Sequence, residues 1–587
     1  MTVMRGVLAG MSACSAWVMA AGGAPLTGTV RTQPGQGVAG ALVTLHAFEQ
    51  QRDTTVYADA EGHFVFPSVE AGTYHLRARR SGYRDNVVVV DLPTDAESVR
   101  IVALERETDP RELAWQLPAN RWLALAMARL PDDEAREEFK RQCTFCHQQG
   151  NWATRVQRDP EEWRKIFALM ARMGGILSSR VRDVLPEALN SAYDEASYIP
   201  ALGEHFEAPA PPRESAVITE WEVGAAGSFQ HDAVVHPDGR VYVVDMTQDR
   251  LYRLDPQTGV RSAFDIPRGD SPLGGVFAQQ RPIPINADAH VGPHSIQVAP
   301  DGALWMSLAL GNKLARFDPV RERFEIVEQA GGGLYPHTLR FDAKGRLWYT
   351  LAISNHVGML DPSTGEKRTF RLPARTWGEA AVVRFLPFGM WLQKFIDLTP
   401  SGDGPQLPIP YGIDIAPDGG VWFSQLNERR IGRLDPESGA VTLIDTPFPA
   451  PRRLRFDGQG NLWIPSFSGS LLARFTPSTG VFKTWPLPTE PAGTETPYAL
   501  NIDRRRGMVW ICGTNSDTLI RFDPADEQFS VYPMPTRVTY TREIDFDAAG
   551  AVWTSNSNLP SWQIEGAVPK LIRLEPRDGG TPHLTVR

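Results

Sequence analysis

The chain has 587 residues, which is more than one ordinary domain holds and predicts three or four domains. Hydrophobic residues make up 42% of the chain and charged residues 22%, the composition of a globular protein with ample core-forming material. The net charge of −9 at pH 7 argues against nucleic acid as a partner.

The first residues predict a secretory signal peptide over residues 1–24. Arg5 supplies a short positive region, residues 6–21 are apolar, and a small-residue cleavage site follows. The apolar stretch is too short to cross a bilayer, and no other stretch is long enough, so we expect no transmembrane helix. A poor lipobox leaves a lipoprotein anchor at Cys14 as the alternative. Either leader places the protein in the periplasm or outside the cell.

Residues 25–105 have the pattern of a small β-sandwich. Apolar and polar residues alternate in short runs such as 42–45 and 74–78, and glycine-containing turns separate the runs. The motifs Asp59-x-x-Gly62-x-Phe64 and Gly72-x-Tyr74 lie in a segment that resembles the carboxypeptidase regulatory-like domain. The resemblance implies a non-catalytic module, and no catalytic cluster is visible in the segment.

Residues 106–205 change to helical periodicity, with helices predicted over 121–129, 132–142, 159–173 and 179–198. The second of these leads into Cys143-Thr144-Phe145-Cys146-His147, the c-type haem attachment pattern. Two thiols on one turn can each add to a haem vinyl group, and the adjacent His147 binds the iron.

Other interpretations of this motif are a redox dithiol, half of a zinc site or a coincidence. A redox dithiol would lie near a βαβ pattern, and a zinc site would need a second Cys or His pair nearby; neither is present. Cys14 and Cys512 offer no structural disulfide partner. The sequence therefore predicts one covalently attached haem c.

The same segment looks like a cytochrome c domain. Trp163 and the run Arg172-Met173-Gly174-Gly175 are similar to a Trp…Arg-Met-x-x-Gly pattern of haem domains attached to quinohaemoprotein-type enzymes. That resemblance implies Met173 as the distal iron ligand, with Met170 as the alternative. Both can also be core methionines. A His/Met pair raises the reduction potential and favours electron transfer, whereas an open iron binds small molecules.

Residues 215–587 repeat a unit of about 43 residues, which predicts a seven-bladed β-propeller. Each unit contains one aromatic anchor, and successive anchors are 63, 43, 74, 41, 47 and 43 residues apart. The anchors are Tyr242, Trp305, Trp348, Trp422, Trp463, Trp510 and Trp553. Residues 219–223 look like an outer strand that completes the last blade. The chain is thus expected to be a multidomain, mostly β protein with a small β-sandwich, an α-helical cytochrome c domain and this propeller.

Two intervals are long because of insertions at 268–293 and 374–410. Both precede an inner strand and so belong on the face beside the central funnel. Residues 377–395 of the second insertion are apolar and aromatic. They are interpreted as a lid, a haem-docking surface, a partner site or an insertion that packs on its own blade.

The repeats resemble those of virginiamycin B (streptogramin) lyases, which implies a metal-dependent C–O lyase reaction with magnesium. Pro293-His294 and Pro336-His337 match the two catalytic histidine motifs of that family, in adjacent blades. The family's glutamate is not matched, because Met306-Ser307-Leu308 follows Trp305. Elimination needs a base and a metal partner, so the missing carboxylate puts lyase activity in doubt.

Ring geometry brings the first residue of every inner strand to the funnel mouth. These residues are His231, His294, His337, Tyr411, Arg452, Tyr498 and Arg542, with His290 just upstream of His294. Such a set suits either a divalent metal or, through its arginines, an anionic or polar ligand.

The sequence is consistent with three functions. The first is a haem-linked oxidoreductase or electron carrier that serves a periplasmic electron-transfer partner, with a ligand or metal at the funnel. The second is the lyase, with the haem domain as a passenger. The third is a non-enzymatic protein that binds a small molecule, a peptide or a glycan.

Overall fold

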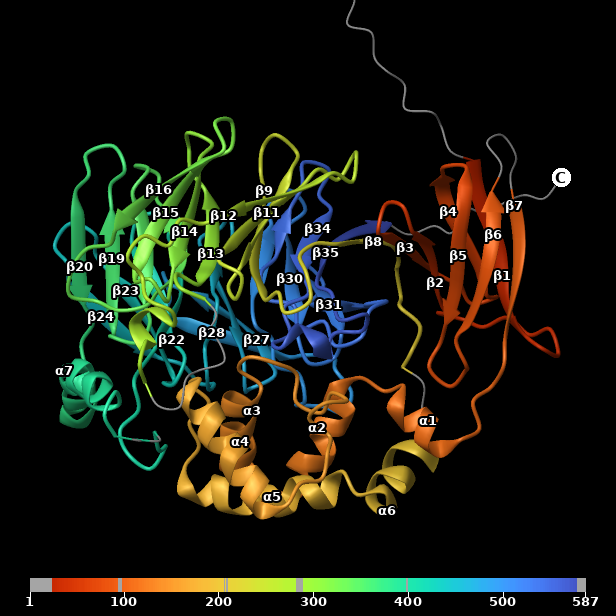
Figure 1. Ribbon diagram of the computed structural model, residues 1–587, viewed down its shortest axis with the longest axis horizontal. Coiled ribbons are helices and arrows are strands. Elements are labelled where there is room, and N and C mark those ends of the chain that lie inside the picture. The colour runs from red at the N-terminus through yellow and green to blue at the C-terminus, as the bar shows by residue number, and fades with distance from the viewer. Residues whose placement is uncertain are drawn as a thin grey trace, which may run out of the picture.

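The computed structural model describes residues 24–92, 98–204, 206, 209–280, 289–396, 398 and 400–577. The predicted signal peptide, apart from Ala24, and Cys14 lie outside these residues. The described chain is mostly β. Figure 1 shows a β-sandwich at one side, a ring of sheets in the middle, and a row of helices across one face of the ring.

The N-terminal β-sandwich packs two sheets around a core that includes Val30, Leu45, Phe64 and Leu76. One sheet has the order β4-β1-β7 and the other contains β3-β2-β5-β6. The strands are β1 Ala24–Thr32, β2 Leu42–Ala47, β3 Arg52–Tyr57, β4 His63–Val69, β5 Gly72–Arg79, β6 Asn86–Leu92 and β7 Ser98–Leu104.

The helices that follow enclose a core of their own, which includes Trp122, Leu123, Phe139 and Leu185. Their starts follow from capping, because Asp132 accepts from the amide of Ala135, as expected of an N-cap residue. They are α1 Pro110–Trp115, α2 Ala119–Met127, α3 Asp133–Cys143, α4 Pro160–Arg172, α5 Ser179–Ala192 and α6 Glu195–Tyr198, followed by a π-helical turn at Ile199–Glu204.

Seven four-stranded antiparallel units make up the propeller-like part, and every predicted aromatic anchor lies on the second strand of its unit. Units 1 to 3 are β9 Gln230–Val235, β10 Val241–Asp245, β11 Arg250–Leu254 and β12 Arg261–Asp265; β13 Pro293–Val298, β14 Leu304–Leu308, β15 Lys313–Asp318 and β16 Arg323–Glu328; and β17 Pro336–Phe341, β18 Leu347–Leu351, β19 His356–Leu360 and β20 Lys367–Arg371.

Units 4 to 6 continue the same order of strands. They are β21 Pro410–Ile415, β22 Val421–Gln425, β23 Arg430–Leu434 and β24 Val441–Asp445; β25 Arg455–Phe456, β26 Leu462–Ser466, β27 Leu471–Thr476 and β28 Val481–Pro486; and β29 Leu500–Asp503, β30 Met508–Gly513, β31 Thr518–Asp523 and β32 Gln528–Pro533. The seventh unit is β33 Asp545–Phe546, β34 Val552–Ser555, β35 Lys570–Arg577 and β8 Ser215–Glu222.

Strand β8 joins the two ends of the ring, as the sequence predicts. It precedes the first unit in the chain but pairs along its whole length with β35, the third strand of the last unit. Such closure leaves no free edge between the first and last units. The other edge of β8 pairs with β3 of the sandwich, from Arg52 opposite Trp221 to Val56 opposite Val217. The sandwich and the last propeller unit therefore share one eight-stranded sheet.

Both insertions leave the ring on the face that carries the helices. The first contains a 3-10 turn, Gly275–Phe277, and its residues 281–288 lie outside the described chain. The second contains α7, Trp377–Leu392, at the side of the ring opposite the sandwich (Figure 1). Beyond α7, Gly402 donates to the carbonyl of Leu177, so this insertion reaches the helices that cover the ring.

Candidate functional site

The predicted haem-attachment motif forms the end of α3 and the turn after it. Thr144 caps the helix, and its hydroxyl donates to the Lys140 carbonyl at 2.6 Å. Lys140 points into the propeller, where its ammonium donates to the carbonyl of Gly493 at 2.8 Å. Gly150 ends the turn with φ of 97°, and a Cβ there would lie 2.3 Å from the Ala119 carbonyl oxygen. The turn is thus fixed at both ends.

Propeller side chains bind the carbonyl groups of this turn directly. Tyr540 donates to the carbonyl of Phe145 at 2.7 Å, and Arg542 donates to that of Cys146 at 2.9 Å. Just beyond the motif, the amide of Gln148 donates to Asn558 at 3.0 Å. These propeller residues are buried, so the bonds form away from solvent. The motif therefore lies against the funnel end of the propeller.

The two thiols of the motif are free and half-buried. Burial raises the pKa of the Cys143 thiol, and it raises that of the Cys146 thiol despite the nearby positive charges of Arg542 and Arg452. Reactive redox dithiols need a lowered thiol pKa, so the redox-dithiol interpretation loses support. The Cys143, Cys146 and His147 ligand atoms also do not gather within 4.8 Å of one another, as a zinc site requires, in the described chain.

The His147 ring is oriented by its own backbone. Its Nδ1 atom lies 3.1 Å from the carbonyl oxygen of Gln148, which can only accept, so Nδ1 carries the proton. Burial lowers the pKa of His147, and the charge of Arg542 lowers it further. The ring is therefore neutral with Nε2 available as a ligand atom, which is the form in which histidine binds metals.

Met173, the predicted distal ligand, forms the C-cap of α4 and is half-buried. It packs against an apolar cluster of the propeller that includes Phe229 and Leu559, with Tyr335 at its edge. The ring centroid of Tyr335 lies 6.3 Å from that of the funnel residue His294. Met173 thus approaches the funnel, which the cysteine motif also borders through Arg542. Met170, one turn earlier, is half-buried in α4.

The predicted funnel residues form a closed, buried ring of contacts. The ring centroids of His231 and His294 are 3.5 Å apart, those of His294 and His337 4.0 Å, and those of His337 and Tyr411 4.1 Å. The hydroxyls of Tyr411 and Tyr498 are 2.5 Å apart, and Tyr498 lies 3.3 Å from Nε2 of His231. His290 does not join them, because it binds Arg268 and Asp249 at the rim.

Buried arginines set the electrostatics of this ring. Burial and the charges of Arg542 and Arg453 hold the pKa of His231 well below its usual range, and burial does the same for His294 and His337. The three imidazoles are therefore neutral at pH 7. Burial would raise the pKa of Tyr498, but the nearby arginines outweigh it and lower that pKa.

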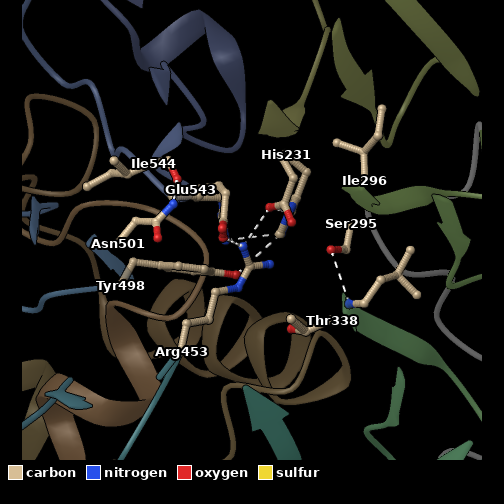
Figure 2. Close-up of polar contacts among 12 residues, drawn as sticks. His231, Ser295, Ile296, Thr338, Arg453, Tyr498, Asn501, Glu543 and Ile544 are labelled. Atoms are coloured by element: carbon tan, nitrogen blue, oxygen red, sulfur yellow. Dashed lines mark hydrogen bonds and ion pairs between the residues drawn. The ribbon is translucent and has the colours of Figure 1, made fainter. Parts of the chain in front are cut away.

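Carboxylates compensate only some of the buried arginines. Arg453 donates to Asp232 at 2.8 Å and also binds Glu543, and Figure 2 shows it reaching between Glu543 and His231. Arg452 and Arg542 have no carboxylate partner among the described residues. Instead, the guanidinium of Arg452 stacks 3.6 Å from the Tyr498 ring centroid, and that of Arg542 lies 4.7 Å from it. The funnel end thus holds an excess of positive charge.

Sequence reasoning missed Tyr540, which binds the motif, and two carboxylates of the funnel network, Glu543 and Asp232. Tyr540 and Glu543 flank the predicted Arg542, and Asp232 follows the predicted His231. The one feature of the sequence that points to these residues is that each lies within two positions of a predicted funnel residue. His231 donates from Nδ1 to Asp232 at 2.8 Å, which leaves its Nε2 to accept from Tyr498.

The predicted divalent metal of the propeller gains no support from this geometry. In the described chain, only Asp59, Glu61 and His63 bring three possible ligand atoms within 4.8 Å of one another. That group is an exposed turn of the sandwich, in which Asp59 accepts from the amide of His63 at 2.7 Å. The rings of His294 and His337 lie 4.0 Å apart with their planes tilted by 45°, and Nδ1 of His337 is 2.9 Å from the hydroxyl of Thr338 rather than from a carboxylate.

A separate cavity of about 680 Å³ lies where the sandwich, the helices and the propeller meet. It is lined by Arg79, Arg80, Arg537 and the connecting segment 209–213. The cavity lies beside the shared sheet and has none of the funnel histidines in its wall.

Comparisons with known proteins agree with the two β parts. Residues 25–105 match the model of the carboxypeptidase regulatory-like domain. The N-terminal sandwich is a carboxypeptidase regulatory-like domain. No curated protein matches the chain. None of the helices in the described part of the chain is long and apolar enough to cross a membrane.

Solved structures with a similar propeller share little sequence with the chain. A streptogramin B lyase is 18% identical, with a TM-score of 0.47 over 61% of this chain and 97% of the other. Virginiamycin B lyase from Staphylococcus aureus is 17% identical, with a TM-score of 0.46 over 61% and 98%. Kuenenia stuttgartiensis hydrazine synthase is 13% identical, with a TM-score of 0.41 over 60% and 97%. At this similarity the comparisons concern the fold alone.

Proposed function

We propose that this protein is a periplasmic or secreted monohaem c-type cytochrome that exchanges electrons with an anionic or polar ligand at the propeller funnel. One observation carries the proposal: the Cys143–His147 turn lies against the funnel, with the Cys146 carbonyl bound by Arg542. A group attached to that turn would lie beside the ring of funnel histidines and tyrosines. Attachment in the same chain keeps donor and acceptor together at a high effective concentration.

The side chains of the motif fit a haem c. Two free thiols lie on one turn, and His147 is held by a carbonyl so that Nε2 is available. Met173 approaches the same region and would supply a thioether ligand to the iron. When bound, a haem c supplies a one-electron redox centre.

The funnel residues can bind a ligand and move a proton. Arg452 and Arg542 are buried cations without a carboxylate partner in the described chain, and an anion would offset their charge. The hydroxyl of Tyr498 lies 3.3 Å from Nε2 of His231, a weak base because burial and the arginines lower its pKa, so the proton moves to His231 only when Tyr498 loses an electron. Asp232 stabilises the imidazolium that this transfer forms. Removal of an electron at the funnel can therefore be accompanied by proton transfer at Tyr498.

Covalent haem attachment is the first test of this proposal. Protein secreted from cells with a c-type haem assembly system is expected to keep haem on a denaturing gel and to gain one haem in mass. The double variant C143A/C146A should lose the attached haem completely, because both thioether bonds are removed. The matched control is Cys512→Ala, a buried cysteine of the propeller, which should keep it. A wild-type chain without covalent haem would overturn the proposal.

The distal ligand gives a second prediction. Replacement of Met173 by Ala should abolish the methionine–iron charge-transfer band of the oxidised protein and lower its reduction potential, because a thioether ligand favours the reduced iron. Met170→Ala, one turn away on the same helix, should leave the band in place. Absorption spectra and redox titrations of the two variants measure this. A band that survives in M173A would assign the sixth position to another residue.

A further inference from the structure

Helix α7 and the residues that follow it expose a group of large apolar side chains. Seven large apolar side chains between residues 377 and 398 are more than a third exposed, and they are Trp377, Phe385, Phe388, Trp391, Phe395, Ile396 and Leu398. Trp377 is 87% exposed and Phe385 65%. A contiguous exposed patch of this kind on a water-soluble protein marks an interaction surface.

The aromatic side chains form a single stripe along the helix. Trp377, Phe385, Phe388 and Trp391 fall within about 120° of one another around the helix axis at 3.6 residues per turn. On the opposite side of the first turns, Glu379 and Val383 are buried. The helix therefore presents one apolar face outward and packs by the other.

The N-terminal turn of α7 is attached firmly to the propeller. Glu379 binds the buried Arg430 of β23 at 2.9 Å and accepts from the amide of Arg375. Thr376 caps the helix through the amide of Glu379. The stripe is therefore held in one orientation, at the side of the ring away from the sandwich (Figure 1).

The charges on α7 indicate what covers the stripe. Residues 377–398 contain two carboxylates, Asp397 and Glu379, and Glu379 is buried in the ion pair with Arg430. The remaining charges, Arg384 and Lys394, are basic, whereas the whole chain has a net charge of −9. In a symmetric pair of copies the stripe would face itself and bring the basic residues of both chains together, whereas an apolar layer under anionic headgroups complements both the aromatic side chains and the basic charges.

We propose that α7 is an in-plane anchor that binds the surface of a membrane containing anionic lipids. Its 16 residues span about 24 Å, too short to cross the hydrocarbon core, so the helix lies along the interface. Trp and Phe occupy the boundary between headgroups and acyl chains, and Arg384 and Lys394 reach the lipid phosphates. This anchor does not depend on the haem and would operate in the apoprotein as well.

Vesicle binding by the full secreted chain tests the anchor. Wild-type protein is mixed with vesicles of phosphatidylglycerol and phosphatidylcholine, and the bound fraction is measured by flotation. We expect binding that weakens as salt is raised, and tryptophan fluorescence that is quenched by brominated acyl chains. The triple variant F385Q/F388Q/W391Q should bind at least about tenfold more weakly, because the apolar stripe is removed.

Two further variants separate the effect of the stripe from that of exposed apolar residues in general and from that of charge. The control V320Q/V481Q removes two apolar residues that are 88% and 59% exposed elsewhere on the propeller, and it should bind as the wild type does. The double variant R384Q/K394Q should lose the preference for anionic over neutral vesicles. Wild-type protein that stays unbound at low salt, or a triple variant that binds equally well, would overturn the proposal. A concentration-dependent wild-type dimer that the triple variant abolishes would also overturn it, in favour of a second copy.

Discussion

Replacing Glu543 by Gln should lower the free energy of unfolding by about 3–5 kcal/mol. Glu543 is buried and accepts from Arg340 at 3.1 Å, from Arg455 at 2.5 Å and from Arg453. Without its charge, the counter-charges that the described residues leave to the three buried guanidinium groups are Asp232 and, at 4.0 Å from Arg340, Asp414. Loss of one partner leaves buried charge uncompensated, and that loss is costly in the propeller interior.

Urea unfolding followed by tryptophan fluorescence measures this loss. The matched control is Glu575→Gln, which removes a half-exposed carboxylate paired with Arg573 at 2.7 Å on β35. A surface pair of this kind contributes less than about 1 kcal/mol, so the control should unfold close to the wild type. Equal losses in the two variants would show that the Glu543 network does not stabilise the propeller interior.

The repeated part of the fold is accessible from sequence because one local pattern is used seven times. Each aromatic anchor marks the second strand of a unit, and Trp305 and Trp463 occupy equivalent places in the structure. Closure by residues 219–223 is also predictable, since the last unit lacks a strand that the first segment can supply. The ring of His231, His294 and His337 follows from the same repetition, because equivalent strand starts converge on the axis.

The contacts between the sandwich, the helices and the propeller cannot be predicted from the sequence in the same way. Strand β3 reads as an ordinary edge of a sandwich, and nothing in its sequence specifies that its partner is β8, more than 150 residues later. The motif around Cys146 has a local signature and the repeat predicts Arg542 at the funnel, but no pattern in the sequence indicates that Arg542 and Tyr540 bind the carbonyl groups of the motif. These polar contacts occur once in the molecule and depend on how the two domains pack together. A repeating pattern in the sequence therefore cannot predict them.

The join between the sandwich and the propeller contains two ion pairs that acid should weaken. Asp53 of β3 binds Lys570 of β35 at 2.5 Å, and Glu565 binds Arg79 of β5 at 2.6 Å. Burial would raise the pKa of Asp53, but the bond from His46 and the charge of Lys570 outweigh it and bring that pKa to about 2. Burial would likewise raise the pKa of Glu565, and the bonds from Arg79 bring it to about 2.

Both pKa values are lower in the folded protein than the ordinary values of 3.8 and 4.5. Unfolded carboxyl groups therefore bind protons first as the pH falls, so the stabilisation is complete above about pH 4.5 and is lost between pH 4.5 and 2. At about 1.4 kcal/mol per pKa unit, Asp53 contributes about 2 kcal/mol above this range. Glu565 contributes less stabilisation than the lowering of its pKa suggests, because its side chain is one-third exposed and solvent screens its ion pair with Arg79.

Comparison of the wild type with the double variant D53N/E565Q over this pH range isolates the two groups. At pH 7 the variant should be less stable by about 2–4 kcal/mol, and the difference should shrink toward zero as the pH approaches 2, because the wild-type carboxyl groups are then also neutral. Urea midpoints at each pH measure this. Glu325→Gln, an exposed carboxylate on β16, should leave the whole profile unchanged. A wild-type and double-variant difference that is constant with pH would mean that the two substitutions disturb the packing of the shared sheet rather than its ion pairs.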